Sequence, residues 1–336
     1  MTIHSELMLT FLTALPAALL LTVLLCRYVI PVLRARRVGQ HVFSEYVAEH
    51  QNKEGTPTMG GICFIIPMLL LIVPYVLLVA LKGGSDRLIP LALTVCLGVA
   101  NALIGFFDDY QKLSHKQNLG LKSWQKFLLQ IVAAALYLWA MSATECLTTV
   151  VSLDAFHTSF DLGPVYYALA LIVIVGMINS TNLTDGIDGL ASTVALVANM
   201  SLALVAFILV DGEAVLLSSL TIGGMVGFLV YNYHPAKVFM GDTGSLFLGA
   251  MLIGTGFMMN KPLLVLVMSG VFILDMLSSL IQIVSIRFFH RKVFRIAPVH
   301  HQFQKMGWGE EKIVYLFSGV GLLFGVIAVL LALCGI

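Results

Sequence analysis

Charge is scarce in this chain. Only 11% of its 336 residues are Asp, Glu, Lys or Arg, whereas 59% are hydrophobic and the mean hydropathy is +0.96. A soluble globular domain carries about 25% charged residues. The shortage of charge therefore excludes a soluble domain and a disordered chain, and it predicts a membrane protein.

Paired cysteines, internal repeats and long linkers are also missing. The five cysteines lie in or beside apolar runs without CxxC spacing, so we expect neither a disulfide framework nor a zinc site. The first apolar run has no basic residues before it and no small-residue cleavage site after it, so we expect it to be retained as a span. We interpret residues 1–336 as one integral membrane domain.

What the chain has instead is long uncharged runs. A membrane-spanning helix needs roughly 20 mostly apolar residues. Ten such runs are present, and they predict an all-α, polytopic membrane helical bundle and exclude a lipid-facing β-barrel. The runs are 7–26, 55–81, 88–107, 127–144, 162–184, 189–210, 214–236, 243–260, 262–286 and 313–336.

Lysine and arginine are distributed unevenly between the two sides of these runs. One side keeps only Lys82, Arg87 and Lys261, and all the others fall on the opposite side. The positive-inside rule places the basic side in the cytoplasm and both termini in the periplasm. The cytoplasmic loops are then 31–60, 108–126, 184–190, 233–244 and 287–312. The net charge of +1 alone indicates no partner.

Carboxylates gather at the cytoplasmic ends of the spans. A single acid there is as readily explained by headgroup contact or helix capping, but five on one side favour a functional site. They are Asp108, Asp109, Asp185, Asp188 and Asp242. The lone Asp275, deep in the ninth run, is expected to make a structural hydrogen bond between helices.

The spacing of the first four acids suggests their roles. Asp108 and Asp109 are adjacent, so they cannot face the same way on a helix and are expected to have separate roles. Asp185 and Asp188 would share one helical face if the turn between them continues as helix. Either Thr184 or Asp185 is expected to cap the following span, which would leave N–H groups free for a phosphate.

Two further loops carry groups suited to phosphate. Gly241-Asp242-Thr243-Gly244 at a loop-to-helix junction is a plausible metal-phosphate site, because Asp is a hard oxygen ligand and its neighbours offer N–H and hydroxyl donors. His300 and His301 offer donors for phosphate or groups for proton transfer. Together these features indicate phosphoryl transfer at a membrane surface.

These residues resemble the phospho-N-acetylmuramoyl-pentapeptide transferase family, within the polyprenyl-phosphate N-acetylhexosamine-1-phosphate transferases. The resemblance rests on five motifs in order: GTPTMGG at 55–61, FFDDY at 106–110, NLTDGIDGLA at 182–191, VFMGDTGSL at 238–246 and APVHH at 297–301.

The resemblance implies a ten-helix homodimer in the bacterial cytoplasmic (inner) membrane. It implies a Mg2+-dependent enzyme that moves phospho-MurNAc-pentapeptide from UDP-MurNAc-pentapeptide to undecaprenyl phosphate, giving lipid I and UMP. This reaction is the first membrane step of peptidoglycan synthesis. The lipid bilayer is an expected partner and nucleic acid is not.

The same resemblance implies roles for individual residues. Asp242 is the expected Mg2+ ligand, and the catalytic group is Asp108, Asp109, Asp242, His300 and His301. Phe239 is expected to stack on uracil. The other expected substrate-binding residues are Lys53, Thr58, Asn182, Asp185, Gly186, Asp188 and Asn232. The chain departs from the family pattern at Gln302, where a third His is usual, and at Gln304, where an acid is usual.

Two other hypotheses remain open from sequence. One is a UDP-N-acetylglucosamine:polyprenyl-phosphate GlcNAc-1-phosphate transferase of the same superfamily, although GTPTMGG and APVHH favour the muramoyl branch. The other is a cation-coupled membrane transporter, because acids in spans also mark ion paths. Transporter sites lie near the midplane at repeat interfaces, whereas these acids lie at one face and no repeat is visible.

Overall fold

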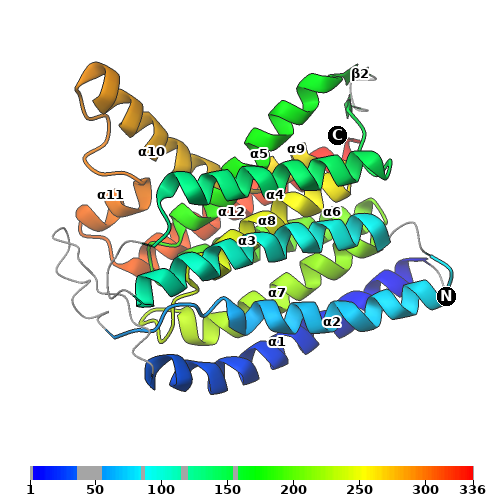
Figure 1. The fold of residues 1–336 in the computed structure, drawn as a ribbon, viewed down its shortest axis with the longest axis horizontal. Coiled ribbons are helices and arrows are strands. Elements are labelled where there is room, and N and C mark those ends of the chain that lie inside the picture. Colours follow the sequence, from blue (N-terminus) through cyan, green and yellow to red (C-terminus); the bar gives the residue numbers. More distant parts are fainter. Residues whose placement is uncertain (1–2, 36–54, 85–87, 115–119, 154–157, 336) are drawn as a thin grey trace.

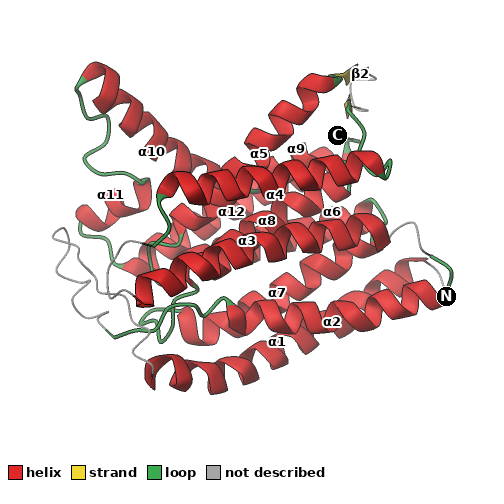
Figure 2. Cartoon of the chain, in the orientation of Figure 1, coloured by secondary structure: helices red, strands yellow, loops and turns green. Residues whose placement is uncertain are grey.

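A computed structural model describes residues 3–35, 55–84, 88–114, 120–153 and 158–335. Helices dominate these ranges, and the only strands within them form one hairpin (Figures 1 and 2). The elements are α1 (Ile3–Ala35), α2 (Ile62–Leu81), α3 (Leu88–Ser114), α4 (Ser123–Ala143), β1 (Val150–Leu153), β2 (Thr158–Asp161), α5 (Pro164–Thr184), α6 (Leu190–Ile208), α7 (Gly212–Asn232), α8 (Gly241–Met258), α9 (Pro262–Met268), α10 (Gly270–Phe289), α11 (Val299–Lys305) and α12 (Glu310–Leu333).

The predicted membrane helical bundle is confirmed. Among the described residues, nine helices are long and apolar enough to cross a membrane, namely α1 to α7, α10 and α12. Many of their large apolar side chains face outward, as expected for surfaces in contact with lipid. The tenth crossing and the periplasmic location of both termini stay predictions.

Helix α8 forms the centre of the bundle (Figure 1). All its residues from Thr243 to Met258 are buried. Small residues let the neighbouring helices approach its backbone closely. A Cβ added at Gly105 of α3 would lie 2.2 Å from the backbone oxygen of Asp242, so this glycine presses the end of α3 against the first turn of α8.

The ninth predicted run, 262–286, is not one continuous helix. Helix α9 ends at Met268, and α10 begins at Gly270 and projects away from the bundle (Figure 1). The break lies beside α12. A Cβ at Gly270 would be 2.7 Å from ring atoms of Phe324, which belongs to α12. Beyond the break, exposed side chains such as Ile283 and Phe288 give α10 an apolar surface.

The loop between α4 and α5 contains the antiparallel hairpin β1–β2, with Val150 paired to Asp161. Asp161 accepts hydrogen bonds from the Thr149 hydroxyl (2.6 Å) and the Gly163 backbone N–H (2.9 Å). These two donors stabilise the carboxylate and lower the pKa of Asp161 below its ordinary value. The hairpin lies at the end of the bundle opposite α11 (Figure 1).

The end of the bundle that holds α11 collects the predicted site motifs (Figure 1). Helices α3 and α5 end there, and α8 begins there. The chain ends marked N and C lie at the opposite end. Residues far apart in sequence therefore meet on one side of the bundle.

Candidate active site

Three carboxylates meet where α3 ends and α8 begins. Asp108, Asp109 and Asp242 each offer an oxygen, and these oxygens lie within 4.8 Å of one another. Carboxylate oxygens are the ligands that Mg2+ prefers in proteins. The donor set therefore fits a hard divalent cation, as the sequence predicted.

The two adjacent acids do have separate contacts. Asp109 accepts the backbone N–H groups of Asp242 (3.2 Å) and Thr243 (3.0 Å) and the Thr243 hydroxyl (2.7 Å). It thereby satisfies N–H groups at the start of α8 that have no partner inside the helix. Asp108 instead accepts the Leu121 backbone N–H at 2.9 Å. One acid holds the helix terminus, and the other faces the loop before α4.

Two lysines that we did not assign to the site lie among these acids. The Lys112 ammonium is 2.6 Å from Asp108 Oδ2 and 3.3 Å from Asp242 Oδ2. The Lys126 ammonium is 2.5 Å from Asp242 Oδ2. The pair Asp108 and Lys112 has the i, i+4 spacing that joins side chains on a helix, which is a signal visible in sequence. The contact of Lys126 has no such signal.

Asn182, at the end of α5, contacts this group of charged residues from a third helix. Its amide donates to Asp242 Oδ1 at 2.8 Å and to the Ser245 hydroxyl at 2.9 Å. Its carbonyl lies 3.4 Å from the Lys126 ammonium. Asn182 therefore lies beside Asp242, and its predicted role in substrate binding stays a prediction.

A cavity of about 640 Å³ adjoins these charges between α3, α4 and α5. One part of its wall is polar and includes Asp108, Lys112, Lys126 and Asp242, and another part is apolar. The apolar part consists of Leu121, Trp124 and Phe127. Trp124 and Phe127 are also exposed on the outer surface of α4.

The turn that joins α5 to α6 differs from two of our expectations. Residues 185–189 form turns and not helix, so Asp185 and Asp188 do not share a helical face. The residue before α6 is Gly189, with φ of 73°, and no side chain caps the helix. Glycine adopts this left-handed conformation without steric cost, which explains why the chain turns here.

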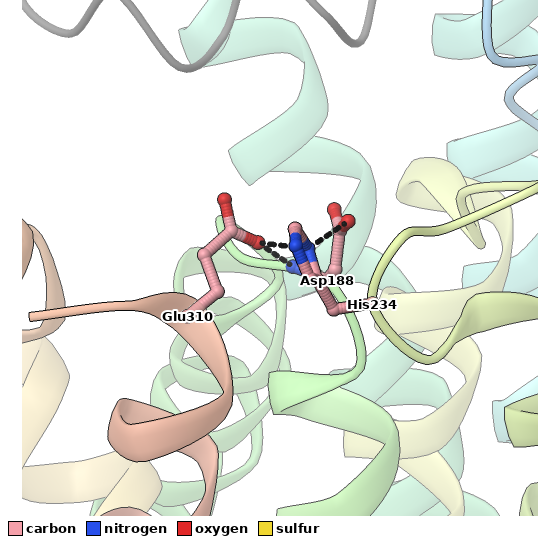
Figure 3. A group of neighbouring side chains, drawn as sticks. All are labelled: Asp188, His234 and Glu310. Carbon is pink, nitrogen blue, oxygen red and sulfur yellow. Dashed lines mark hydrogen bonds and ion pairs between the residues drawn. The ribbon is translucent and has the colours of Figure 1, made fainter.

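Asp188 is fixed by two other segments, and Figure 3 shows His234 and Glu310 beside it. Its carboxylate lies 3.0 Å from His234 Nδ1 and accepts the Ala236 backbone N–H at 3.0 Å. Its own backbone N–H donates to Glu310 Oε2 at 3.1 Å. Glu310 is the first residue of α12, and its Oε2 is 3.6 Å from His234 Nδ1. Sequence analysis identified neither His234 nor Glu310.

The neighbouring Asp185 lies outside the spans, beside Gly186. Removal from water and the negative charges of Asp242 and Asp109 raise the pKa of Asp185 well above its usual range.

The loop before α8 is paired with the turn before α2. Phe239 donates its N–H to the Pro57 carbonyl and accepts the Gly60 N–H, both at 2.8 Å. Asn232 is buried, donates to the Val238 carbonyl at 3.0 Å and accepts the Ser192 hydroxyl at 2.7 Å. The structure thus gives Asn232 a supporting position beneath the loop that carries Phe239.

Thr58 lies on the same turn and faces the acidic group. Its hydroxyl is buried without a hydrogen-bond partner in the described part of the chain, and a Cβ at Gly241 would be 2.7 Å from it. Lys53, the other predicted residue of this loop, lies outside the described residues.

His300 and His301 lie on α11, with their ring centroids 4.2 Å apart. A Cβ at Gly186 would lie 2.6 Å from His300 Nε2 and 3.3 Å from His301 Nε2. Only glycine leaves this space free. The predicted histidines therefore face the turn that also contains Asp185 and Asp188.

Two family models match parts of this chain. The profile of Glycosyl transferase family 4 matches residues 91–260, and the Phospho-N-acetylmuramoyl-pentapeptide-transferase signature 1 matches residues 53–65. The first match covers the acidic group from α3 to α8. The second covers the turn that pairs with Phe239.

Similar proteins extend over almost the whole chain. The phospho-N-acetylmuramoyl-pentapeptide-transferase of Halalkalibacterium halodurans is 38% identical over 313 residues, 93% of this chain and 94% of the relative. The protein of the same name from Bacillus subtilis is 37% identical over 310 residues, 92% and 94% of the two chains. That from Geobacillus kaustophilus is 39% identical over 317 residues, 94% and 96%. The chain therefore belongs to the phospho-N-acetylmuramoyl-pentapeptide transferase family.

Proposed function

We propose that this protein transfers phospho-MurNAc-pentapeptide from UDP-MurNAc-pentapeptide to undecaprenyl phosphate, forming lipid I and UMP. The observation that carries the proposal is the acidic and basic group at the start of α8, set in the wall of a cavity that is also partly apolar. Such a cavity suits a phosphate attached to a hydrocarbon chain. Family membership supplies the identity of the two substrates.

We propose Mg2+ as the cofactor, held by Asp242 together with an oxygen from Asp108 or Asp109. When bound, the cation would neutralise charge between the two anionic substrates. The fit rests on the spacing and the hard oxygen character of the three carboxylates. The lysines that now pair with Asp108 and Asp242 would turn to the substrate phosphates.

The reaction proceeds by direct attack in this proposal. An oxygen of undecaprenyl phosphate forms a bond to the β-phosphorus of the nucleotide, the bond from that phosphorus to the bridging oxygen breaks, and UMP leaves with the electron pair. A phosphate monoester has its second pKa near 6, so the lipid phosphate is largely dianionic at pH 7. It needs no strong base, and cancellation of repulsion between the anions is the main requirement.

Two lysines, one on α3 and one on α4, would reduce the repulsion between the two anions. Lys112 and Lys126 bring two positive charges beside the cavity that would hold the lipid phosphate. Asp108 orients that phosphate or accepts its residual proton. Asp109 has a different part, because its three contacts hold the start of α8 in position.

The nucleotide would bind next to this group. Phe239 would stack on uracil, and Asp188 and Gly186 would line the same pocket. Asp185, Asn182 and Thr58 would contact the nucleotide between this pocket and the acidic group. Lys53 would complete the pocket by analogy with the family, and Asn232 would support the loop that carries Phe239.

We further propose that the protein is a homodimer in the bacterial cytoplasmic membrane, with the α11 end facing the cytoplasm. The excess of lysine and arginine in the loops at that end supports the orientation. The soluble nucleotide substrate would then reach the site from the cytoplasm, and the lipid would reach it from the bilayer.

Release of UMP by the detergent-purified protein tests the function. UDP-MurNAc-pentapeptide, undecaprenyl phosphate and Mg2+ should together give UMP and lipid I, and omission of any one should stop the reaction. UDP-GlcNAc in place of the muramoyl nucleotide tests the sibling activity, and turnover only with UDP-GlcNAc would replace our proposal. Cation flux in liposomes without UMP release would instead support a transporter.

The chemical route has its own test. A covalent aspartyl-phosphate route would let labelled UMP exchange into UDP-MurNAc-pentapeptide when lipid is rigorously excluded. Direct attack does not permit this exchange. Lipid-independent exchange at a rate comparable with turnover would overturn the direct route while leaving the overall function intact.

A further inference from the structure

One face of α10 carries three buried polar side chains, at Asp275, Ser278 and Gln282. Their spacing of three and four residues places them on one side of the helix. Gln282 accepts the backbone N–H of Phe294 at 2.9 Å, and the Ser278 hydroxyl accepts that of Val299 at 3.0 Å. This polar face therefore fixes the segment that leads into α11.

Asp275 makes the next contact along this face, and its partner is His300. The carboxylate oxygen Oδ2 lies 2.6 Å from His300 Nδ1, and Oδ1 accepts the His300 backbone N–H at 3.3 Å. Both side chains are fully buried. The Thr184 hydroxyl, at the end of α5, lies 3.2 Å from the same Oδ2. The expected structural hydrogen bond between helices is confirmed, but the carboxylate also binds a residue of the site.

This pairing determines which nitrogen of His300 is available. A carboxylate that accepts from the backbone and from Nδ1–H leaves Nε2 as the free ring nitrogen. Nε2 is buried and has no hydrogen-bond partner in the described part of the chain. It faces the space over Gly186, which a Cβ would fill. A buried polar nitrogen without a partner is unfavourable, so its presence here indicates a place for a ligand.

The adjacent histidine has a different partner. His301 Nδ1 lies 2.7 Å from Gln304 Oε1, which is an uncharged amide oxygen. In the family pattern this position is usually an acid, whereas the contact of His300 Nδ1 is to the carboxylate of Asp275. Among the described residues, Asp275 on α10 and His301 on α11 are titratable groups that contact His300. Asp185 precedes Gly186 in the turn that His300 Nε2 faces.

We propose that Asp275 is a positioning residue for the transfer reaction. It holds His300 as an imidazolium whose Nε2–H donates to a phosphate oxygen of the uridine nucleotide over Gly186. Negative charge grows on the leaving UMP as its bond to the β-phosphorus breaks, and this hydrogen bond stabilises that charge. No covalent bond to His300 forms. The inference rests on the proposed function and assigns one of its charge-stabilising contacts.

The test is the pH dependence of UMP release by Asp275→Asn in the full-length protein. We expect kcat to fall roughly 10–100-fold, by analogy with removal of a carboxylate that orients a metal-bound histidine. The alkaline limb of the pH–rate profile should move to lower pH, because the amide no longer stabilises the protonated ring. Asp275→Glu should restore both properties in part.

Two further variants separate positioning from general support of the fold. Ser278→Ala loosens the same segment without contact to the ring, so it should leave the alkaline limb in place. In a His300→Gln background, Asp275→Asn should cause little additional loss of kcat. An equal loss in both backgrounds, or an unchanged pH profile in Asp275→Asn, would overturn the proposal.

If Asp275→Asn does not accumulate in the membrane, variants of the two histidines provide the test. His300→Gln should remove the alkaline limb, and His301→Gln should keep it, whereas the reverse would overturn the proposal. The wild type is assayed in parallel. Absence of UMP release from the wild type would contradict the proposed function, and active wild type with an unaltered Asp275→Asn profile contradicts only this inference.

Discussion

The carboxylate of Asp109 caps the first turn of a helix from which it is separated by 134 residues in sequence, because it binds both the N–H and the hydroxyl of Thr243. Gly105, one turn earlier on α3, makes the contact possible by letting α3 approach the backbone of α8. This relationship places Asp108 and Asp242 side by side. Asp109 thus binds the start of α8, whereas Asp108 faces the loop before α4.

Asp242→Asn should abolish Mg2+-dependent turnover and leave a folded, extractable protein. The amide keeps the shape and the hydrogen bond to Asn182 but loses the charge that a hard cation needs. The measurement is the initial rate of UMP release across a Mg2+ titration, with size-exclusion behaviour as the control for folding. A near wild-type rate at saturating Mg2+ would show that Asp242 is not the ligand.

Lys126→Ala should lower kcat by about 100-fold, the scale of losing one preorganised donor at a transition state. Its ammonium contacts Asp242 at the wall of the cavity, so the variant loses positive charge where the phosphates would meet. Lys122→Ala is the matched control, because Lys122 is exposed at the start of the same helix. Equal effects of the two substitutions would argue against a role for Lys126 at the phosphates.

Glu310→Ala should raise KM for the uridine nucleotide at least tenfold and change kcat little. The variant removes the acceptor of the Asp188 N–H, and a hydrogen bond to a charged group is worth about 1.5–3 kcal/mol. Glu310→Gln should retain most affinity because its amide oxygen can still accept. Glu311→Ala, at the exposed neighbouring position, should behave as wild type. The anchoring role is refuted if Glu310→Ala and Glu311→Ala have the same KM.

Asp185→Asn should raise the unfolding temperature at neutral pH. The folded state raises the pKa of Asp185, so ionisation disfavours the folded state as pH rises from the ordinary value near 4 through the raised value. The variant removes this penalty, which should increase the unfolding temperature by about 2–4 °C per kcal/mol removed. Thermal unfolding at neutral pH and near pH 4 checks the sign, because the difference should shrink at the lower pH.

Phe239→Ala should weaken binding of the uridine nucleotide more than binding of undecaprenyl phosphate. Stacking of an aromatic ring on a base contributes about 1–3 kcal/mol, which corresponds to a roughly 5- to 150-fold loss of affinity. Phe239→Leu keeps bulk without the stacking face and should resemble Phe239→Ala. An equal loss of affinity for both substrates would indicate that Phe239 packs against protein groups and does not stack on uracil.

Much of the site was visible in sequence because its residues lie in local motifs. The adjacent acids at 108 and 109 and the GDTG motif around Asp242 lie at ends of apolar runs, and the histidines at 300 and 301 lie in the last basic loop. The structure brings them to one end of the bundle. Their roles in catalysis stay predictions. The shared helical face of Asp185 and Asp188 depended on the turn between them continuing as helix. It does not, because residues 185–189 form turns and Gly189 adopts a left-handed conformation before α6.

The sequence by itself determined that the chain is a bundle of membrane helices, because the hydrophobicity that drives a segment into a bilayer is a property of about 20 consecutive residues. Only the tertiary structure decided that Lys126 contacts Asp242, that Glu310 holds the turn of Asp188, and that Asp275 binds His300. These contacts join residues on different segments of the fold. Their formation depends on how closely the helices pack, and the glycines that allow this packing carry no periodic signal along the chain.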